Sequence, residues 1–335
     1  MSPAPSEFTV VIDGPIDYAA SLEMFRRSGD DLIDRWDGKY FLRTIAIGAS
    51  PIAYACKFET SGDVLNVNVT LDDSRGHDEI ERQVRSMFVM PPASFAELIS
   101  MDRAIGALNC HYPAVRSVRQ ANLFSALIRC ISTQQVNLRW AATCRRRLAE
   151  TFGRLHNVGG HFVYSLDPVR LAGLEITDIR ALQLTNRKAE YIINVARAIA
   201  SGELTIAILA KLTDAEIIAR LTAIRGIGVW TAEWILARTL GRPRVVAGDL
   251  GVRKAIGIAY SDGVMPPEAE VRRITAHWGD SSAVAQAILL HALAEKTLTN
   301  VVSKAKADGA VAPPAAAIAT RRNARNSLCA SRRKL

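Results

Sequence analysis

Two hydrophobic patterns divide the chain. In residues 64–71 (VLNVNVTL) apolar and polar residues alternate, and similar runs occupy residues 8–12, 40–47 and 52–58. Such runs predict half-buried strands, and the short turns that contain Gly, Ser and Pro between them predict antiparallel hairpins. From residue 94 to 299 the apolar spacing is instead that of helices joined by short connections. The chain therefore predicts an α+β fold, with a small antiparallel β-sheet followed by an all-α helical bundle.

Three parts follow from these patterns. Residues 1–90 are expected to form an N-terminal α+β domain, in which a helix over residues 78–88 covers one face of the sheet. Residues 91–300 are expected to form the helical domain. Residues 301–335 are rich in Ala and Pro and then in Arg, with few residues that could build a core, so we expect a disordered basic tail.

Composition excludes several classes of protein. No apolar run reaches the roughly 18–20 residues that a membrane span needs, and the N-terminus lacks the basic and apolar segments of a signal peptide. The five cysteines are scattered, with no CxxC spacing, which argues against a metal site or a disulfide framework. We therefore expect a cytoplasmic protein without a zinc or iron–sulfur site.

The net charge of the chain says little about the partner of its folded part. The chain has a net charge of +9, which would favour a nucleic-acid partner. The segment from Ser303 onward holds +7 of this charge and leaves +2 for the rest. Such a tail either raises non-specific affinity for nucleic acid by releasing counterions or is simply solvated. Evidence for a polyanion site in the folded part must come from local motifs.

The most informative stretch is residues 221–254, LTAIRGIGVWTAEWILARTLGRPRVVAGDLGVRK. Two helical segments are interrupted by residues 225–228 (RGIG), whose glycines permit a sharp turn and close approach of a ligand to the backbone. The helix predicted to begin at Val229 adds unpaired N–H groups and a positive dipole end. This arrangement favours binding of a phosphate.

Asp249 is the strongest candidate for chemistry. It precedes a predicted helix over 250–259, so a helix N-cap would explain it without any further role. However, Gly248 and Gly251 leave space beside the carboxylate, and the preceding residues 245–247 are apolar. These neighbours predict a partly desolvated carboxylate that faces a ligand, a role compatible with capping.

Other polar and aromatic residues have two interpretations each. Trp230 and Trp234 are one helical turn apart and share a face, which could pack in the core or form an aromatic wall for a planar ligand. Gln134 and Gln135 lie between two predicted helices. They could form a polar turn, or their side chains could reach a nucleobase. Residues 145–147 (RRR) are interpreted as a solvated face.

The segments LTAIRGIGVWTAE and VVAGDLGVRKA resemble the helix-hairpin-helix DNA glycosylase superfamily. Within it, the Gly-Ile-Gly-x-Trp-Thr-Ala hairpin and the β-rich N-terminal domain are most similar to DNA-3-methyladenine glycosylase II, over about residues 8–300. This resemblance implies a base excision repair enzyme that binds duplex DNA and hydrolyses the N-glycosidic bond of alkylated bases, such as 3-methyladenine and 7-methylguanine.

The resemblance also assigns roles to residues. Asp249 would be the catalytic carboxylate, Trp230 and Trp234 would line the base pocket, and Gln134 or Gln135 would enter the duplex. No cofactor is implied, although hairpin carbonyls could bind a monovalent cation, and a monomer is expected. The residues that would contact DNA are Gly226, Ile227, Gly228, Thr231, Arg253 and Lys254.

Two positions bear on mechanism and specificity. Relatives that also cut the DNA backbone carry a lysine where this chain has Trp230, and an indole cannot form a Schiff base, so the resemblance implies a monofunctional enzyme. Members of the alkylation-repair branch often carry a further aromatic residue in the base pocket, near the C-terminal helices. This residue is missing here unless Trp278 replaces it. Two alternatives remain: a glycosylase for oxidised or mispaired bases, or a non-catalytic helix-hairpin-helix DNA-binding protein.

Overall fold

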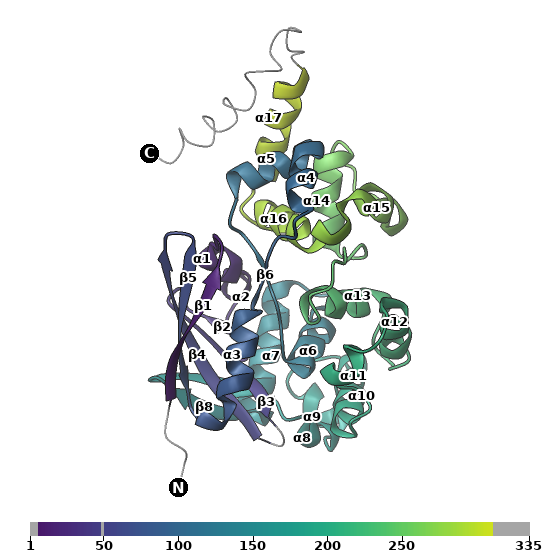
Figure 1. The fold of residues 1–335 in the computed structure, drawn as a ribbon. Coiled ribbons are helices and arrows are strands. Elements are labelled where there is room, and N and C mark those ends of the chain that lie inside the picture. The colour runs from purple at the N-terminus through teal and green to yellow at the C-terminus, as the bar shows by residue number, and fades with distance from the viewer. Residues whose placement is uncertain (1–5, 48–49, 311–335) are drawn as a thin grey trace.

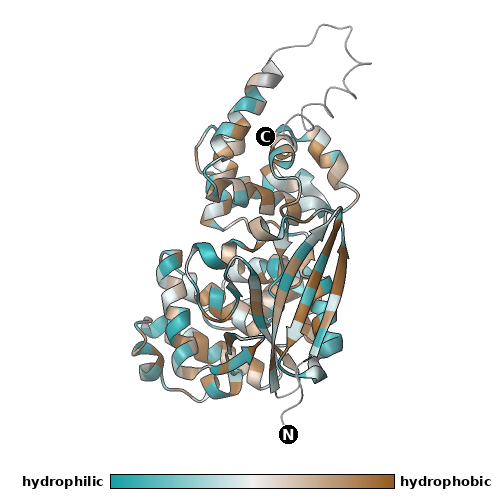
Figure 2. Cartoon of the chain, turned by 90° about the vertical axis from the view of Figure 1, so that its left-hand side faces the viewer, coloured by the Kyte–Doolittle hydropathy of each residue, from teal (hydrophilic) through white to brown (hydrophobic). Residues whose placement is uncertain are grey.

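The computed structural model describes residues 6–47 and 50–310. Its N-terminal part is a five-stranded antiparallel sheet in the order β1-β5-β4-β3-β2 (Figure 1). The alternation in β5 places Leu65, Val67 and Val69 in the core, and Figure 2 shows hydrophobic segments along the strands. The strands are β1 (Ser6–Asp13), β2 (Arg35–Trp36), β3 (Tyr40–Ile47), β4 (Ser50–Ser61) and β5 (Val64–Leu71).

Short helices complete this part of the molecule. Helices α1 (Tyr18–Leu22) and α2 (Met24–Arg27) connect β1 to β2. The turn η1 (Ser74–Gly76) leads into α3 (His77–Arg85), which buries Ile80 and Val84 against the sheet. The predicted order of an antiparallel sheet followed by helices is therefore confirmed.

The helical region contains two separate hydrophobic clusters, which periodicity alone did not reveal. The first cluster is built mainly from α6 to α13, together with Leu32 and Ile33. The second joins α4 and α5 to the helices that follow Val245. After the sheet, the chain therefore enters the second cluster, returns to build the first, and then completes the second (Figure 1).

The helices of the first cluster are α6 (Leu123–Thr133), α7 (Leu138–Phe152), α8 (Pro168–Ala172), α9 (Ile176–Arg180), α10 (Asn186–Ala200), α11 (Ile206–Leu209), α12 (Asp214–Thr222) and α13 (Val229–Arg238). Those of the second are α4 (Phe95–Met101), α5 (Arg103–His111), α14 (Leu250–Tyr260), α15 (Glu268–Thr275), η2 (Ala276–Ser281), α16 (Ser282–Ala294) and α17 (Leu298–Ala310). The strands β6 (Phe88–Val89) and β7 (Ser117–Val118) pair where the chain passes between the parts.

Two expectations from the sequence are corrected. The region from 94 to 299 contains a hairpin of β8 (Arg154–Val158) and β9 (His161–Ser165), and its Val158 and Val163 pack against the sheet. The helix α17 runs to Ala310, so the first ten residues of the predicted tail are helical, because Val302 is buried in the second cluster. The remainder of the predicted tail, residues 311–335, lies outside the described residues.

A buried network of ion pairs connects the N-terminal part to the first helical cluster. Asp31 Oδ2 lies 2.8 Å from both Arg129 and Arg145, whose helices α6 and α7 flank the loop with the two glutamines. Asp34 is paired with Arg43 at 2.6 Å. Arg145 is 3% exposed, so the interpretation of residues 145–147 as a solvated face is wrong for this residue. The cause is the distant carboxylate of Asp31, which sequence spacing does not show.

We predict that Asp31→Asn lowers the free energy of unfolding by about 3 kcal/mol, because it leaves two buried guanidinium groups without their carboxylate. Burial acts to raise the pKa of Asp31, but Arg129 and Arg145 outweigh it and hold that pKa below its ordinary value. The wild-type protein should therefore lose this stability as the pH falls through the folded-state pKa, and the variant should lose less. Denaturant unfolding at several pH values measures both effects.

The exposed pair of Arg146 and Glu150 provides the control, since both side chains are about half exposed. Glu150→Gln should change the free energy of unfolding by at most about 0.5 kcal/mol. A loss below about 1 kcal/mol for Asp31→Asn at neutral pH would show that the buried network does not hold the two parts together.

Candidate active site

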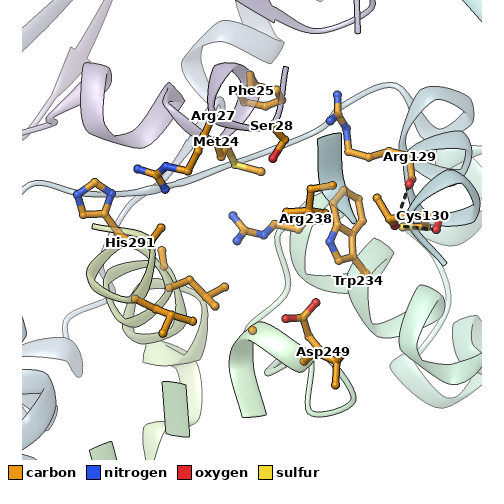
Figure 3. Close-up of a pocket in the computed structure, with 18 of the residues that line it drawn as sticks. Met24, Phe25, Arg27, Ser28, Arg129, Cys130, Trp234, Arg238, Asp249 and His291 are labelled. Atoms are coloured by element: carbon orange, nitrogen blue, oxygen red, sulfur yellow. Dashed lines mark hydrogen bonds between the residues drawn. The ribbon is translucent and has the colours of Figure 1, made fainter. Parts of the chain in front are cut away.

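A cavity of about 790 Å³ lies where the hydrophobic core of the N-terminal part meets the two clusters of the helical region. Its wall is mostly apolar and is formed by α1 and α2 of the N-terminal part, by the loop between α6 and α7, and by the facing surfaces of α13, α14 and α16 (Figure 3). The volume falls in the range of cavities that bind small molecules. Segments far apart in the sequence therefore form one site.

The carboxylate of Asp249 is fixed at the edge of this cavity. Asp249 is the N-cap of α14, where its Oδ1 accepts a hydrogen bond from Val252 N at 3.0 Å. Its Oδ2 accepts a second hydrogen bond from Trp230 Nε1 at 3.3 Å. A Cβ atom at Gly251 would lie 3.0 Å from Oδ1, so this glycine leaves room for the carboxylate. Capping and presentation to the cavity therefore occur together.

The predicted phosphate-binding turn joins α12 to α13. Gly226 has φ of +102°, and a Cβ there would lie 2.1 Å from the ring of Tyr191, so its role is to permit close packing of the turn. Gly228 is the exposed N-cap of α13, and a Cβ on it would have no neighbour within 4 Å. The amide of Ile227 donates to Ile224 O at 3.0 Å. The part of the turn that is accessible to a ligand is thus Gly228 with the first turn of α13. The expectation that the Ile227 amide is available to DNA is corrected, because this amide is already hydrogen-bonded.

The three remaining residues expected to contact DNA differ in their accessibility. Thr231 is 1% exposed, because it lies on the face of α13 that packs into the core, so its predicted contact with DNA is also corrected. Arg253 is partly buried and its Nε donates to Pro266 O at 2.9 Å. Lys254 is exposed and has its side chain at the surface.

One face of α13 lines the cavity. Trp230, Trp234 and Arg238 are spaced by four residues and all three lie in the cavity wall. Trp234 also packs against the first hydrophobic cluster, which confirms the core interpretation, while its role as a wall for a planar ligand stays a prediction. Trp278 is instead buried in the second cluster, with Nε1 3.3 Å from Asp102 Oδ2. It does not replace the missing pocket aromatic.

The two glutamines have different environments. Gln134 Nε2 donates to the carbonyl of Gly226 at 3.1 Å, so this side chain ties the loop to the hairpin. Gln135 is exposed and has φ of +55°, a conformation that non-glycine residues rarely adopt. Ser132, at the end of α6, is held by Arg145 and Lys188 at 2.8 and 2.9 Å. Gln135 is therefore the glutamine that projects from a supported loop.

Charged residues of the cavity were largely missed by the sequence analysis. Arg238 was detectable, because its spacing from Trp234 repeats that between the two tryptophans. Burial lowers the pKa of Arg238, and the nearby Asp249 acts in the opposite direction. Burial also lowers the pKa of His291 on α16. Among the described residues of the cavity wall, Asp249 is the only one with a carboxylate side chain.

Two features of other protein classes are absent from the described residues. No group of three or more His, Cys, Asp or Glu side chains there could hold a metal ion. Within the same ranges, no helix is both long and apolar enough to cross a membrane.

Comparisons with known proteins place this site in a family. Residues 128–281 match the HhH-GPD superfamily base excision DNA repair protein model. YfjP of Bacillus subtilis (strain 168) is 38% identical over 136 residues, which cover 40% of this chain and 46% of that protein, so this match spans about half of the relative. A DNA-3-methyladenine glycosylase of the same organism is 28% identical over 271 residues, which cover 78% of this chain and 89% of that protein.

A solved structure shares the overall architecture of this chain. The 3-methyladenine DNA-glycosylase of Archaeoglobus fulgidus has the same fold, with a TM-score of 0.73 and 20% identity over 88% of this chain and 98% of that one. The matched residues 128–281 include the hairpin, the face of α13 and Asp249. The segment that forms the hairpin and carries Asp249 therefore matches the HhH-GPD superfamily of base excision DNA repair proteins.

Proposed function

We propose that this protein is a monofunctional DNA-3-methyladenine glycosylase, which removes alkylated bases from damaged duplex DNA in base excision repair. The observation that carries the proposal is the carboxylate of Asp249, held by two hydrogen bonds at the edge of a cavity that is walled by Trp230 and Trp234. The DNA-3-methyladenine glycosylase of Bacillus subtilis, aligned over most of both chains, supports the same function.

The substrate must first leave the base stack. An enzyme cannot reach the glycosidic bond inside a duplex, so the damaged nucleotide is extruded into a pocket. The exposed Gln135 is placed to fill the gap in the stack, because Gln134, Arg145 and Lys188 support its loop. The backbone is gripped at Gly228, where the first N–H groups of α13 and its dipole favour a phosphate.

Cleavage of the N-glycosidic bond builds positive charge on the sugar. A carboxylate already fixed in place stabilises this charge without reorganisation during the reaction, and Asp249 meets this condition because both of its oxygens accept hydrogen bonds. Alkylated purines such as 3-methyladenine are themselves cationic. They would also gain about 0.5–2 kcal/mol from each cation–π contact with the tryptophans.

The absence of strand cleavage is inferred from Trp230. Its indole occupies the position where the lyase relatives carry lysine, and its Nε1 is hydrogen-bonded to Asp249. No lysine is among the described residues of the cavity wall, and the nearby Lys188 Nζ donates to Ser132 O. The described part of the cavity wall therefore offers no amine for a Schiff base.

We predict that Asp249→Asn releases methylated base at least about 100-fold more slowly in single-turnover reactions but still binds the damaged duplex. The amide retains the size of the side chain and one acceptor for the Val252 amide, while the negative charge and the second acceptor are lost. Free 3-methyladenine and 7-methylguanine from alkylated DNA are measured directly. Release at the wild-type rate would remove Asp249 from the mechanism, and a wild-type protein that retains DNA without releasing base would be a binding module only.

The phosphate grip can be separated from folding at Gly228. A side chain there has open space, so Gly228→Asp should fold normally, and its carboxylate is a preferred N-cap for α13. The same carboxylate should repel a phosphate, and we expect about 10-fold weaker binding to duplex DNA at moderate salt, with an unchanged melting temperature. By contrast, Gly226→Ala should lower the melting temperature, because its Cβ would overlap Tyr191. Unchanged DNA affinity of Gly228→Asp would place the grip elsewhere.

We further predict that the wild-type protein leaves an abasic site in an intact strand. Because no lysine of residues 6–47 and 50–310 lines the cavity, sodium borohydride should trap no covalent complex with DNA during base release. Gel analysis of strand breaks and of trapped adducts tests this directly. A trapped adduct, or strand cleavage that keeps pace with base release, would identify a lyase and contradict a monofunctional mechanism.

A further inference from the structure

Five arginine side chains contribute to the cavity wall, and their charges are compensated unequally. Four have strong acceptors: Arg27 pairs with Glu295, Arg129 and Arg145 with Asp31, and Arg116 donates to three backbone carbonyls. The fifth, Arg238, donates through Nη1 to the hydroxyl of Ser117 at 2.8 Å. In the described part of the chain it makes no ion pair within 4 Å. The partly buried guanidinium of Arg238 therefore has N–H groups that can donate hydrogen bonds to a ligand in the cavity.

The position of Arg238 defines what those donors would meet. Trp230, at the start of α13, is next to the turn that grips the DNA backbone, and Arg238 is the last residue of the same helix. Eight residues of helix separate them by about 12 Å. In Figure 3 the guanidinium of Arg238 extends into the cavity beyond Trp234, above the carboxylate of Asp249. A base that enters past Trp230 would therefore turn its far edge toward Arg238.

We propose that Arg238 is a further catalytic residue, which binds the acceptor edge of the extruded base and stabilises a neutral base as it leaves. This inference rests on the proposed glycosylase function. Guanidinium groups bind pairs of acceptors, such as the O6 and N7 atoms of a purine, through their fixed fork of N–H donors. Arg238 would thereby extend the pocket from cationic alkylated bases to neutral bases that carry an exocyclic oxygen.

The need for this cation follows from the electron balance of the reaction. When the C1′–N bond breaks, the electron pair goes to the base, and water adds to C1′. A cationic alkylated base becomes neutral, and the proton of the attacking water is released to solvent. A neutral base becomes an anion and finally takes up that proton. The guanidinium stabilises the anion before protonation, while Asp249 stabilises the sugar in both cases.

The two substrate classes should consequently respond differently to the loss of Arg238. For a neutral base, the transition state loses its stabilising cation. For a cationic base, removing the guanidinium also removes a repulsive charge, so the rate should be nearly unchanged. A residue that only supports the fold would affect both classes by the same factor. The ratio of the two rates is therefore the informative quantity.

The experiment measures single-turnover release of hypoxanthine, a neutral base, and of 7-methylguanine, a cationic base, from otherwise identical duplexes. Arg238→Met should slow hypoxanthine release by about 100-fold and change 7-methylguanine release by less than about 3-fold. Arg238→Lys, which keeps the charge but not the fork, should restore part of the rate for hypoxanthine. Arg146→Met is the control, since Arg146 lies outside the cavity wall and is paired with Glu150 at the surface, and it should leave the ratio of rates unchanged.

Two results would overturn the inference: equal slowing of both substrates by Arg238→Met, or wild-type protein that releases 7-methylguanine but no hypoxanthine. Both leave the proposed function intact, because wild-type release of 7-methylguanine tests it separately. A wild-type protein that releases neither base would instead contradict the proposed function itself. Retained 7-methylguanine release by Arg238→Met also shows that this variant folds.

Discussion

The interaction on which the site depends is the pair of hydrogen bonds that hold the carboxylate of Asp249. One comes from the backbone of α14 and the other from Trp230 on α13, so the carboxylate is fixed relative to two hydrophobic clusters at once. A charge that is fixed before the reaction stabilises a developing cation without paying for reorientation. Even a small displacement of either helix would alter both hydrogen bonds.

The spacing between α13 and α14 is itself maintained by buried polar contacts. Glu233 on α13 is 0% exposed and is paired with Arg244 on the connecting segment and with Arg272 on α15. The amide of Val246, in the same segment, donates to Gln286 Oε1 on α16 at 2.9 Å. The buried pairs around Asp31 perform a similar role between the N-terminal part and the loop that carries Gln135. These contacts explain why a cavity formed by three clusters keeps a defined shape.

Local patterns in the sequence were sufficient for some features. Alternation predicted the strands, and the glycines around Ile227 predicted the turn, because both depend on neighbouring residues. The Gly159-Gly160 pair is a typical signal of a tight hairpin and marks β8 and β9, although the spacing of the surrounding region is helical. The start of the tail was misplaced because the burial of Val302 depends on tertiary packing.

What the sequence could predict about the site was limited for the same physical reason. Asp249 and Trp230 are near in sequence, and their motif identified them. The burial of Arg145 depends on Asp31, more than one hundred residues away, and no periodicity encodes that contact. Likewise, the different environments of Gln134 and Gln135 arise from the approach of the hairpin to the loop after α6. Such long-range pairs require the folded structure.

The central claim is that Asp249 stabilises positive charge on the sugar of an extruded nucleotide. It is tested most directly by comparing the affinity for two duplexes, one with a cationic pyrrolidine in place of the damaged nucleoside and one with a neutral tetrahydrofuran. An analogue that carries the charge of the transition state should bind at least about 100-fold more tightly than its neutral counterpart, and this preference should disappear in Asp249→Asn. Equal affinity of the wild-type protein for both duplexes would contradict the account.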